Sequence, residues 1–188
     1  MNLCIDQGNS RTKIALFKKD GRIVKNLLYK SFTSADVERL FSLYPITQSI
    51  VSSVANMEPA VINALNRLSK KFVLFDHLTP LPIKNCYQTP ETLGHDRIAA
   101  AVGAAHLCPG QNLLIIDAGS AVTYDFVSAE QGYLGGNIAP GIKMRLTALN
   151  QMTKRLPKVE VEPDALTPLF GKNTKEAMAA GVVRGLVF

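Results

Sequence analysis

The residues best suited to chemistry lie in a short stretch near the start of the chain. An apolar run, Leu3 to Ile5, ends in Asp6, and a turn centred on Gly8 leads to Lys13 and a second apolar run. Glycine lets the backbone bend and approach a ligand closely, and polar groups of such a turn can donate to phosphate oxygens. Lysine supplies a compact positive charge, and an aspartate can hold Mg²⁺ through its water shell. These residue types fit a nucleotide phosphate, although Asp-x-Gly-Asn is also typical of a plain hairpin turn.

A second stretch repeats this pattern and favours the phosphate-binding interpretation. The apolar run from Leu113 ends in Asp117, and Gly119, Ser120 and another strand-like run follow. Asp117 lies 111 positions after Asp6. Two similar strand–turn–strand units indicate two related half-domains that face a shared cleft. This organisation resembles the actin-like, sugar-kinase and Hsp70 group of ATP-binding folds.

A third motif, Gly94-His95-Asp96-Arg97, lies between the two copies, at the start of an Ala-rich helical pattern. A guanidinium can bind a carboxylate through two parallel hydrogen bonds, so Arg97 is a candidate to bind a substrate carboxylate. Asp96 is a candidate to accept the proton of an attacking hydroxyl. The alternative interpretation is structural, because an acid in the first turn of a helix interacts favourably with the helix dipole.

Several other kinds of site are excluded by the absence of their motifs. The chain has no Gly-x-x-x-x-Gly-Lys-Ser/Thr loop, Gly-x-Gly-x-x-Gly fingerprint, His-Glu-x-x-His pair or Gly-x-Ser-x-Gly elbow. Its three histidines lack the spacing of metal ligands. Its three cysteines are far apart and odd in number, which argues against a disulfide framework and against Cys-x-x-Cys sites. We expect Cys4 and Cys108 to be buried or half-buried.

The bulk composition predicts an ordinary globular protein. The chain has 188 residues, of which 47% are hydrophobic and 19% charged, enough for one domain or two small ones. Much of the net charge of +6 falls between Arg11 and Lys30, where we favour a solvated strand face over a nucleic-acid surface. The start of the chain lacks the features of a secretory signal, and no apolar run reaches the about 18 residues of a membrane span. We therefore expect a cytoplasmic protein that binds neither nucleic acid nor membrane.

Hydrophobic periodicity predicts the elements that position these residues. For the first half we predict the order β-β-β-α-β-α-β: strands at 3–5, 13–17 and 23–29, a helix at 35–43 capped by Thr33 or Ser34, a strand at 49–54, a helix at 58–69 and a strand at 72–75. The segment 76–92 contains three prolines and little periodicity, so it is the candidate linker. We accordingly expect domains at 1–92 and 93–188.

For the second half, the pattern predicts an Ala-rich helix at 95–107, strands at 112–117 and 123–127, and a turn at Gln131-Gly132. A helix at 142–152 follows a Gly-rich stretch. Asn173 is the expected N-cap of a final helix, with Glu176 at the capping-box position.

Together these motifs resemble those of the type III pantothenate kinases, and the resemblance runs from Asn2 to about Gly185. It rests on five pieces in order: Asp6-x-Gly8-Asn9-Ser10-x-x-Lys13, Gly94-x-Asp96-Arg97, Asp117-x-Gly119-Ser120-Ala121, Gly135-Gly136-x-Ile138-x-Pro140-Gly141 and Gly171-Lys172-Asn173-Thr174. Ser10 and Ser120 stand where the family usually has Thr, so a hydroxyl is retained. The implied fold is the α/β actin-like ATPase (ribonuclease H-like) fold, with two related half-domains of mixed sheets flanking a nucleotide cleft.

The resemblance implies ATP-dependent phosphorylation of pantothenate to 4'-phosphopantothenate, the first step of coenzyme A biosynthesis. Asp96 would orient and deprotonate the acceptor hydroxyl, and Arg97 would pair with the pantothenate carboxylate. Asp6 would organise Mg²⁺ through water, and Asp117 would bind a monovalent cation, K⁺ or NH₄⁺. The implied ATP and phosphate contacts are Asp6, Gln7, Gly8, Asn9, Ser10, Arg11, Thr12, Lys13 and Ser120. The implied pantothenate contacts are Tyr87, Gly94, His95, Asp96, Arg97 and Thr174.

The resemblance also implies a homodimer in which Thr174 reaches the neighbouring subunit's site, and it places Gly135–Gly141 near the adenosine. Family members continue beyond the position of Phe188, where the additional part would complete the last helix, a closing strand and helix, and part of the dimer contact. Two other interpretations stay open. One is a catalytically silent accessory or regulatory protein of the same family, the Bordetella-type accessory factor, and the other is an actin-like sugar kinase or ATPase.

Overall fold

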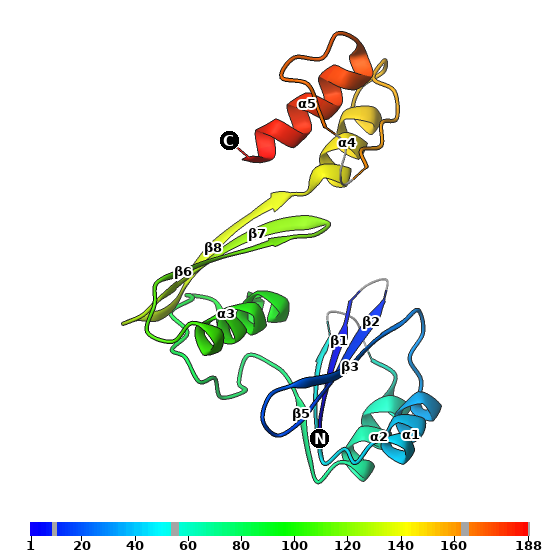
Figure 1. Ribbon diagram of the computed structural model, residues 1–188, viewed down its shortest axis with the longest axis vertical. Coiled ribbons are helices and arrows are strands. Elements are labelled where there is room, and N and C mark those ends of the chain that lie inside the picture. The colour runs from blue at the N-terminus through cyan, green and yellow to red at the C-terminus, as the bar shows by residue number, and fades with distance from the viewer. Residues whose placement is uncertain (9–10, 54–56, 163–165, 188) are drawn as a thin grey trace. The chain divides into compact units, whose positions relative to one another are not determined.

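The structure is a computed structural model that describes residues 1–8, 11–53, 57–162 and 166–187. The chain falls into two units, which Figure 1 draws with their helices and strands. The first unit comprises Met1–Pro82 and Tyr87–Val102, and the second comprises Ile83–Cys86 and Gly103–Phe188. The predicted domain limits of 1–92 and 93–188 stay a prediction.

A five-stranded mixed sheet in the order β3-β2-β1-β4-β5 forms the first unit (Figure 1). β1 (Asn2–Gln7), β2 (Thr12–Phe17) and β3 (Ile23–Tyr29) form an antiparallel meander. β4 (Gln48–Ser53) runs parallel to β1, and β5 (Lys71–Leu74) runs parallel to β4. The central strand β1 is therefore hydrogen-bonded on both sides, and Asp6 lies near its C-terminal end.

Two helices connect the parallel strands. α1 (Ser34–Leu43) has Thr33 as its N-cap, and Asp36 Oδ2 accepts hydrogen bonds from the Thr33 N–H at 3.0 Å and from its hydroxyl at 2.8 Å. α2 (Pro59–Leu68) begins with a proline, which needs no N–H at the first helical position. The predicted element order of the first half is confirmed. The last residue of the predicted strand at 49–54 lies outside the described residues.

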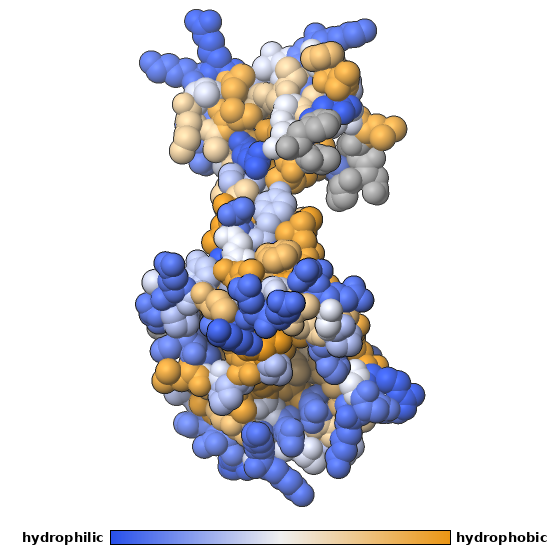
Figure 2. Space-filling view, turned by 90° about the vertical axis from the view of Figure 1, so that its left-hand side faces the viewer, coloured by the Kyte–Doolittle hydropathy of each residue, from blue (hydrophilic) through white to orange (hydrophobic). Residues whose placement is uncertain are grey.

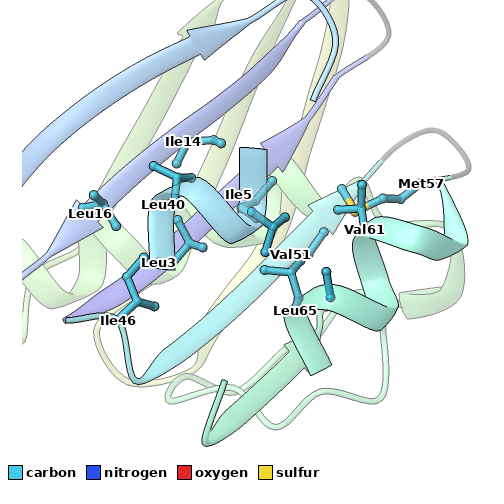
Figure 3. Packing of buried hydrophobic residues seen from close by; sticks show 12 residues of the cluster. Leu3, Ile5, Ile14, Leu16, Leu40, Ile46, Val51, Met57, Val61 and Leu65 are labelled. Atoms are coloured by element: carbon cyan, nitrogen blue, oxygen red, sulfur yellow. The ribbon is translucent and has the colours of Figure 1, made fainter. Parts of the chain in front are cut away.

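The core of the first unit lies between the sheet and these two helices (Figure 3). Leu3 and Ile5 of β1 are 0% and 3% exposed, and they pack with Val51 of β4 and Leu65 of α2. Successive side chains of a strand point to opposite faces of the sheet. The burial of Leu3 and Ile5 therefore directs Asp6 to the face away from the helices.

The second unit contains a three-stranded antiparallel sheet in the order β6-β7-β8. Its strands are β6 (Leu113–Ala118), β7 (Ala121–Ser128) and β8 (Gly132–Pro140). α4 (Ile142–Gln151) and α5 (Thr174–Val187) pack together through Leu146, Met178 and Val182. The sequence predicts no strand at 135–140, so most of β8 is a finding of the structure.

A helix and a 3₁₀ turn are the remaining elements in the described part of the chain. The helix α3 (His95–Leu107) has the bounds predicted from the sequence. A single 3₁₀ turn, η1 (Pro90–Thr92), lies within the segment predicted as a linker. No helix in the described ranges is long and apolar enough to cross a membrane.

The meanders that begin the two units share one arrangement. Asp6 and Asp117 are each the penultimate residue of the first strand, and they stand opposite Lys13 and Thr123 of the second strand. This confirms the repeat that the sequence predicted. The two sheets differ in how they are covered. Leu3 and Ile5 of β1 are buried, whereas Leu114 and Ile116 of β6 are 64% and 57% exposed.

The surface carries both charged and hydrophobic residues (Figure 2). Most of β3 is exposed, including Lys25, which agrees with a solvated basic strand face. Cys4 and Cys86 are half-buried, and burial raises the pKa of the Cys4 thiol. The prediction for Cys108 is wrong, because this residue follows the end of α3 and is exposed.

We expect Leu65→Ala to lower the free energy of unfolding of the first unit by about 2–5 kcal/mol, since removing a fully buried side chain leaves a cavity under α2. Amide hydrogen exchange of α2, followed by NMR, measures this loss. Leu43→Ala is the matched control, because Leu43 is 63% exposed at the end of α1 and its loss should change stability by less than about 0.5 kcal/mol. Equal effects of the two substitutions would contradict the packing of α2 on the sheet.

Candidate active site

The first predicted phosphate turn follows β1. Asp6 is half-buried, and its cross-strand partner Lys13 is exposed on the same face of the sheet. Ligands of open α/β sheets bind beyond the carboxyl ends of the strands, where this pair lies. A carboxylate beside an ammonium group can hold a hydrated divalent cation and a phosphate together.

Other groups of this turn serve the fold itself. Gln7 Oε1 accepts a hydrogen bond from Ser53 Oγ at 2.8 Å, which ties the end of β1 to the end of β4. The Gly8 N–H donates to the Arg11 carbonyl at 3.0 Å and closes the turn. Thr12 is buried, whereas Arg11 is exposed. The remaining predicted phosphate ligands of this turn, Asn9 and Ser10, lie outside the described residues.

The residues at this end of β1 fit Mg²⁺. In the parts of the chain that the structure describes, no three His, Cys, Asp or Glu side chains gather into a metal cage. Mg²⁺ rarely needs such a cage, because it keeps several waters and binds one or two carboxylates together with substrate phosphates. Asp6 offers one carboxylate of this kind.

The second predicted phosphate turn follows β6 and lies against the start of α4. The Gly119 N–H donates to the Ala121 carbonyl at 2.9 Å, and the Gly141 N–H donates to the Ser120 carbonyl at 3.0 Å. A Cβ at position 141 would lie 2.5 Å from the Gly119 oxygen and 2.6 Å from the Ser120 oxygen. Glycine at 141 therefore lets the positive end of α4 approach the exposed Ser120, an arrangement suited to an anion.

A cavity of about 530 Å³ opens beside this second turn. Its size is typical of small-molecule sites. The lining comes from the turn and β7, α4, the segment 159–162 and α5: Ala118, Gly119, Val122, Ile142, Lys143, Leu146, Val159, Glu160, Val161, Glu162, Val183 and Leu186. The pKa of Glu160 is lowered mainly by its hydrogen bond from Lys158, at 2.8 Å, with a smaller contribution from the Lys143 charge.

The third cluster lies at the start of α3, where the Gly-x-Asp-Arg spacing has a local steric reason. Asp96 Oδ1 accepts a hydrogen bond from the Arg97 N–H at 2.9 Å. A Cβ at position 94 would lie 2.5 Å from that same oxygen. Gly94 thus leaves room for the Asp96 carboxylate, which belongs to an exposed residue and can meet a ligand.

Aromatic rings surround this helix start. The Arg97 guanidinium carbon lies 5.8 Å from the centre of the Tyr87 ring, a cation–π distance, and Arg97 is only 5% exposed. The His95 and Phe75 rings meet edge to face, with their centres 5.2 Å apart. Five of the predicted pantothenate contacts, from Tyr87 to Arg97, therefore gather here. Phe75 was missed, and its only sequence signal is an aromatic residue directly after β5.

The last predicted contact, Thr174, is the first residue of α5. Asn173 Oδ1 accepts the Glu176 N–H at 3.0 Å, which confirms Asn173 as the helix cap. Glu176 Oε2 accepts a hydrogen bond from the Lys172 N–H at 2.9 Å. A side chain at position 171 would collide with the backbone of Ala177, so glycine is needed there. This motif therefore holds Thr174 at the start of a capped helix. The candidate residues form four clusters, of which the β1 turn and α3 start belong to the first unit and the β6 turn and α5 start to the second.

Comparison with known proteins gives a consistent picture. The family model of type III pantothenate kinase matches residues 2–188. The type III pantothenate kinase of Phocaeicola vulgatus is 44% identical over 188 residues, which cover 100% of this chain and 76% of the relative. The enzyme of the same name from Bacteroides fragilis is 43% identical over 189 residues, with the same two coverages.

Among solved structures, a proposed 2-dehydro-3-deoxygalactonokinase protein from Sinorhizobium meliloti aligns with a TM-score of 0.54. The alignment covers 100% of this chain and 80% of that protein, at 11% sequence identity. At this identity the likeness concerns the fold alone. Together with the mixed first sheet and the related second sheet, it confirms the predicted actin-like α/β fold.

We expect Gly141→Ala to lower the midpoint of thermal unfolding, because the new methyl group would meet the carbonyl oxygens of the turn at 119–120. Overpacking of this kind costs about 1–3 kcal/mol. Gly181→Ala is the control within α5, where an added Cβ meets nothing within 4 Å. It should stabilise by about 0.5–1 kcal/mol, since alanine is the better helix former. A neutral Gly141→Ala would contradict the close approach of α4 to the turn.

Proposed function

This chain belongs to the type III pantothenate kinase family, and we propose that it transfers the γ-phosphoryl group of ATP to the primary hydroxyl of pantothenate. The product is 4'-phosphopantothenate, the first intermediate on the route to coenzyme A. The observation that carries this proposal is the start of α3, where the exposed Asp96 stands beside Arg97 and Tyr87. A carboxylate, a guanidinium and an aromatic ring suit an acceptor that has a hydroxyl, a carboxylate and an apolar body.

Phosphoryl transfer needs positioning and charge neutralisation more than covalent chemistry from the protein. In this proposal Asp6 holds Mg²⁺ through water, and Lys13 neutralises phosphate charge. When bound, Mg²⁺ neutralises the negative charge that develops on the phosphoryl oxygens. The exposed Arg11 and Ser120 are further candidates for phosphate contacts.

On the acceptor side, Asp96 accepts the proton of the pantothenate hydroxyl and orients its oxygen toward the γ-phosphorus. Gly94 gives this carboxylate its space, and the neighbouring His95 ring packs edge to face against Phe75. Arg97 binds the pantothenate carboxylate, and a guanidinium shielded from water attracts such a group more strongly than an exposed one. Tyr87 holds the guanidinium in a fixed orientation.

Several finer parts of the proposal rest on the family resemblance. Asp117 repeats the position of Asp6 in the second meander and would bind K⁺ or NH₄⁺ through its oxygens. A homodimer would bring Thr174 of one subunit to the pantothenate of the other. We also propose that the reaction takes place in the cytoplasm.

A single assay separates this function from the two alternatives. The purified protein is incubated with ATP, Mg²⁺ and K⁺ and with either pantothenate or a panel of hexoses and sugar acids, and the products are identified by mass spectrometry. The Phocaeicola vulgatus relative serves as the reference enzyme. We expect 4'-phosphopantothenate alone. A phosphorylated sugar would favour a sugar kinase. The absence of a phosphorylated product with every acceptor would favour an accessory protein.

We expect Asp96→Asn to reduce kcat by about 10²–10⁴-fold, the usual contribution of a general base. ATP binding should stay within twofold of the original when it is measured by calorimetry, because Asp96 contacts the acceptor side. Asp20→Asn is the control, since Asp20 is an exposed acid paired with Arg22. Turnover near the original value in Asp96→Asn would remove this residue as the base.

We expect Arg97→Lys to raise the KM for pantothenate about tenfold or more, because lysine keeps the charge but cannot form the paired hydrogen bonds. The KM for ATP should not change. A pantothenate analogue with an alcohol in place of the carboxylate provides the control, since both proteins should phosphorylate it with similar kcat/KM. If the substitution affects both acceptors equally, the carboxylate is recognised elsewhere.

A further inference from the structure

Phe75 follows the last residue of β5 and extends the parallel part of the first sheet by one hydrogen bond. Its N–H donates to the Val51 carbonyl of β4 at 2.8 Å. Val51 is 0% exposed, and it stands opposite Ile5 of β1, the residue just before Asp6. Because β1, β4 and β5 are parallel, Phe75 and Asp6 lie at the same edge of this sheet, beyond or near the carboxyl ends of their strands.

A closed turn directly after Phe75 restrains its backbone on the other side. The Asp76 N–H donates to Thr79 Oγ1 at 3.0 Å. Asp76 Oδ1 accepts hydrogen bonds from the Leu78 N–H at 3.0 Å and from the Thr79 hydroxyl at 2.9 Å. Aspartate commonly closes turns in this way. Phe75 therefore lies between a sheet and a hydrogen-bonded turn, and few backbone conformations are open to it.

The half-buried Phe75 ring contacts the first residue of α3. It meets the His95 ring edge to face, with the ring centres 5.2 Å apart and an angle of 69° between the ring planes. Aromatic pairs favour this arrangement, which contributes more than the burial of apolar area alone. Both residues belong to the first unit. The contact thus ties the start of α3 to the edge of the sheet that carries Asp6.

The position of Asp96 depends on the first turn of α3. Its Oδ1 accepts a hydrogen bond from the Arg97 N–H at 2.9 Å, and the Ile98 N–H closes the turn by donating to the Gly94 carbonyl at 3.3 Å. Arg97 and Ile98 are 5% and 4% exposed, whereas Asp96 is exposed. Burial therefore holds the Arg97 side chain, and the exposed Asp96 follows the turn that His95 begins.

We propose that Phe75 is a positioning residue, which acts through the His95 ring to hold Asp96 in the orientation needed for phosphoryl transfer. The consequence for turnover rests on the function proposed above, whereas the packing of Phe75 on the start of α3 does not. Without the Phe75 ring, the first turn of α3 has a wider range of positions, and the Asp96 carboxylate meets the acceptor hydroxyl less often. Arg97 stays buried beside Tyr87, so the cost falls on turnover rather than on substrate binding.

The test compares Phe75→Leu with two matched variants. Phe75→Leu removes the ring and keeps an apolar side chain, and we expect kcat to fall about three- to tenfold, the effect of one lost aromatic contact. The KM values for pantothenate and ATP should stay within twofold. Phe75→Tyr keeps the ring and should keep the original kcat. Phe72→Leu makes the same change in β5, against the core of the first unit, and should lower the midpoint of thermal unfolding without changing kcat.

A double-mutant cycle tests whether Phe75 acts through His95. His95→Ala removes the other ring and should lower kcat by at least as much as Phe75→Leu does. Adding Phe75→Leu to His95→Ala should lower kcat by less than about twofold more, because the contact is already lost. An unchanged kcat in folded Phe75→Leu, or multiplied losses in the double variant, would overturn the positioning role. If Phe75→Leu fails to fold, an unchanged kcat in His95→Ala would overturn it equally.

Hydrogen exchange separates a failure of this inference from a failure of the proposed function. In Phe75→Leu the Ile98 N–H should exchange about three- to tenfold faster than in the original protein, whether or not the protein phosphorylates pantothenate. It should exchange at the original rate in Phe75→Tyr and Phe72→Leu. Unchanged exchange in Phe75→Leu would overturn the inference and leave the proposed function intact. Faster exchange in a protein with no activity toward pantothenate would support the packing role and reject the proposed function.

Discussion

The alternation of side chains along β1 is the constraint on which the arrangement of the first unit depends. β1 is hydrogen-bonded to β2 on one side and to β4 on the other, and it buries Leu3 and Ile5 under the helices. A shift of the strand register by one residue would expose these two side chains to solvent and bury Asp6 in the core. Such a shift is unfavourable because the burial of apolar surface would be lost. Core packing, rather than any contact of Asp6 itself, therefore determines where its carboxylate points.

The second unit repeats the position of the acid but supports it differently. Leu114 and Ile116 stand where β1 has its buried pair, yet they are 64% and 57% exposed. The β6 turn is held instead by α4, through the hydrogen bond from Gly141 to Ser120 and the absence of a side chain at 141. The end of β6 that carries Asp117 is therefore held by the contact between its turn and the start of α4. The end of β1 that carries Asp6 is held by the core between the sheet and its helices.

Most of the elements and site motifs can be predicted from local patterns in the sequence. The features that the sequence does not predict depend on long-range contacts. The helix at 95–107 and the spacing of Gly94 and Asp96 are local, so periodicity and turn chemistry identify them. β8 was missed because glycines and a proline are unfavourable in strands, but the neighbouring Asp125 and the segment 84–86 require those glycines. Asp125 in an alternating strand suggests an outward residue, whereas in the structure it is buried and accepts a hydrogen bond from the Tyr133 hydroxyl. Tyr87 came from the family resemblance, since no spacing rule connects it with Arg97.

The glycines of the family motifs serve mainly to make room. Gly94, Gly141 and Gly171 do not have positive φ angles, whereas the hairpin residue Gly132 does. At the first three positions an added Cβ would meet, respectively, a carboxylate, two carbonyl groups and the first turn of a helix. Each of these neighbours belongs to a group that the proposed reaction needs, namely the base, the second phosphate turn and the helix that begins at Thr174. These glycines provide space rather than flexibility, so the site residues can lie on rigid strand ends and helix starts. In-line transfer between two bound substrates requires such rigid positioning.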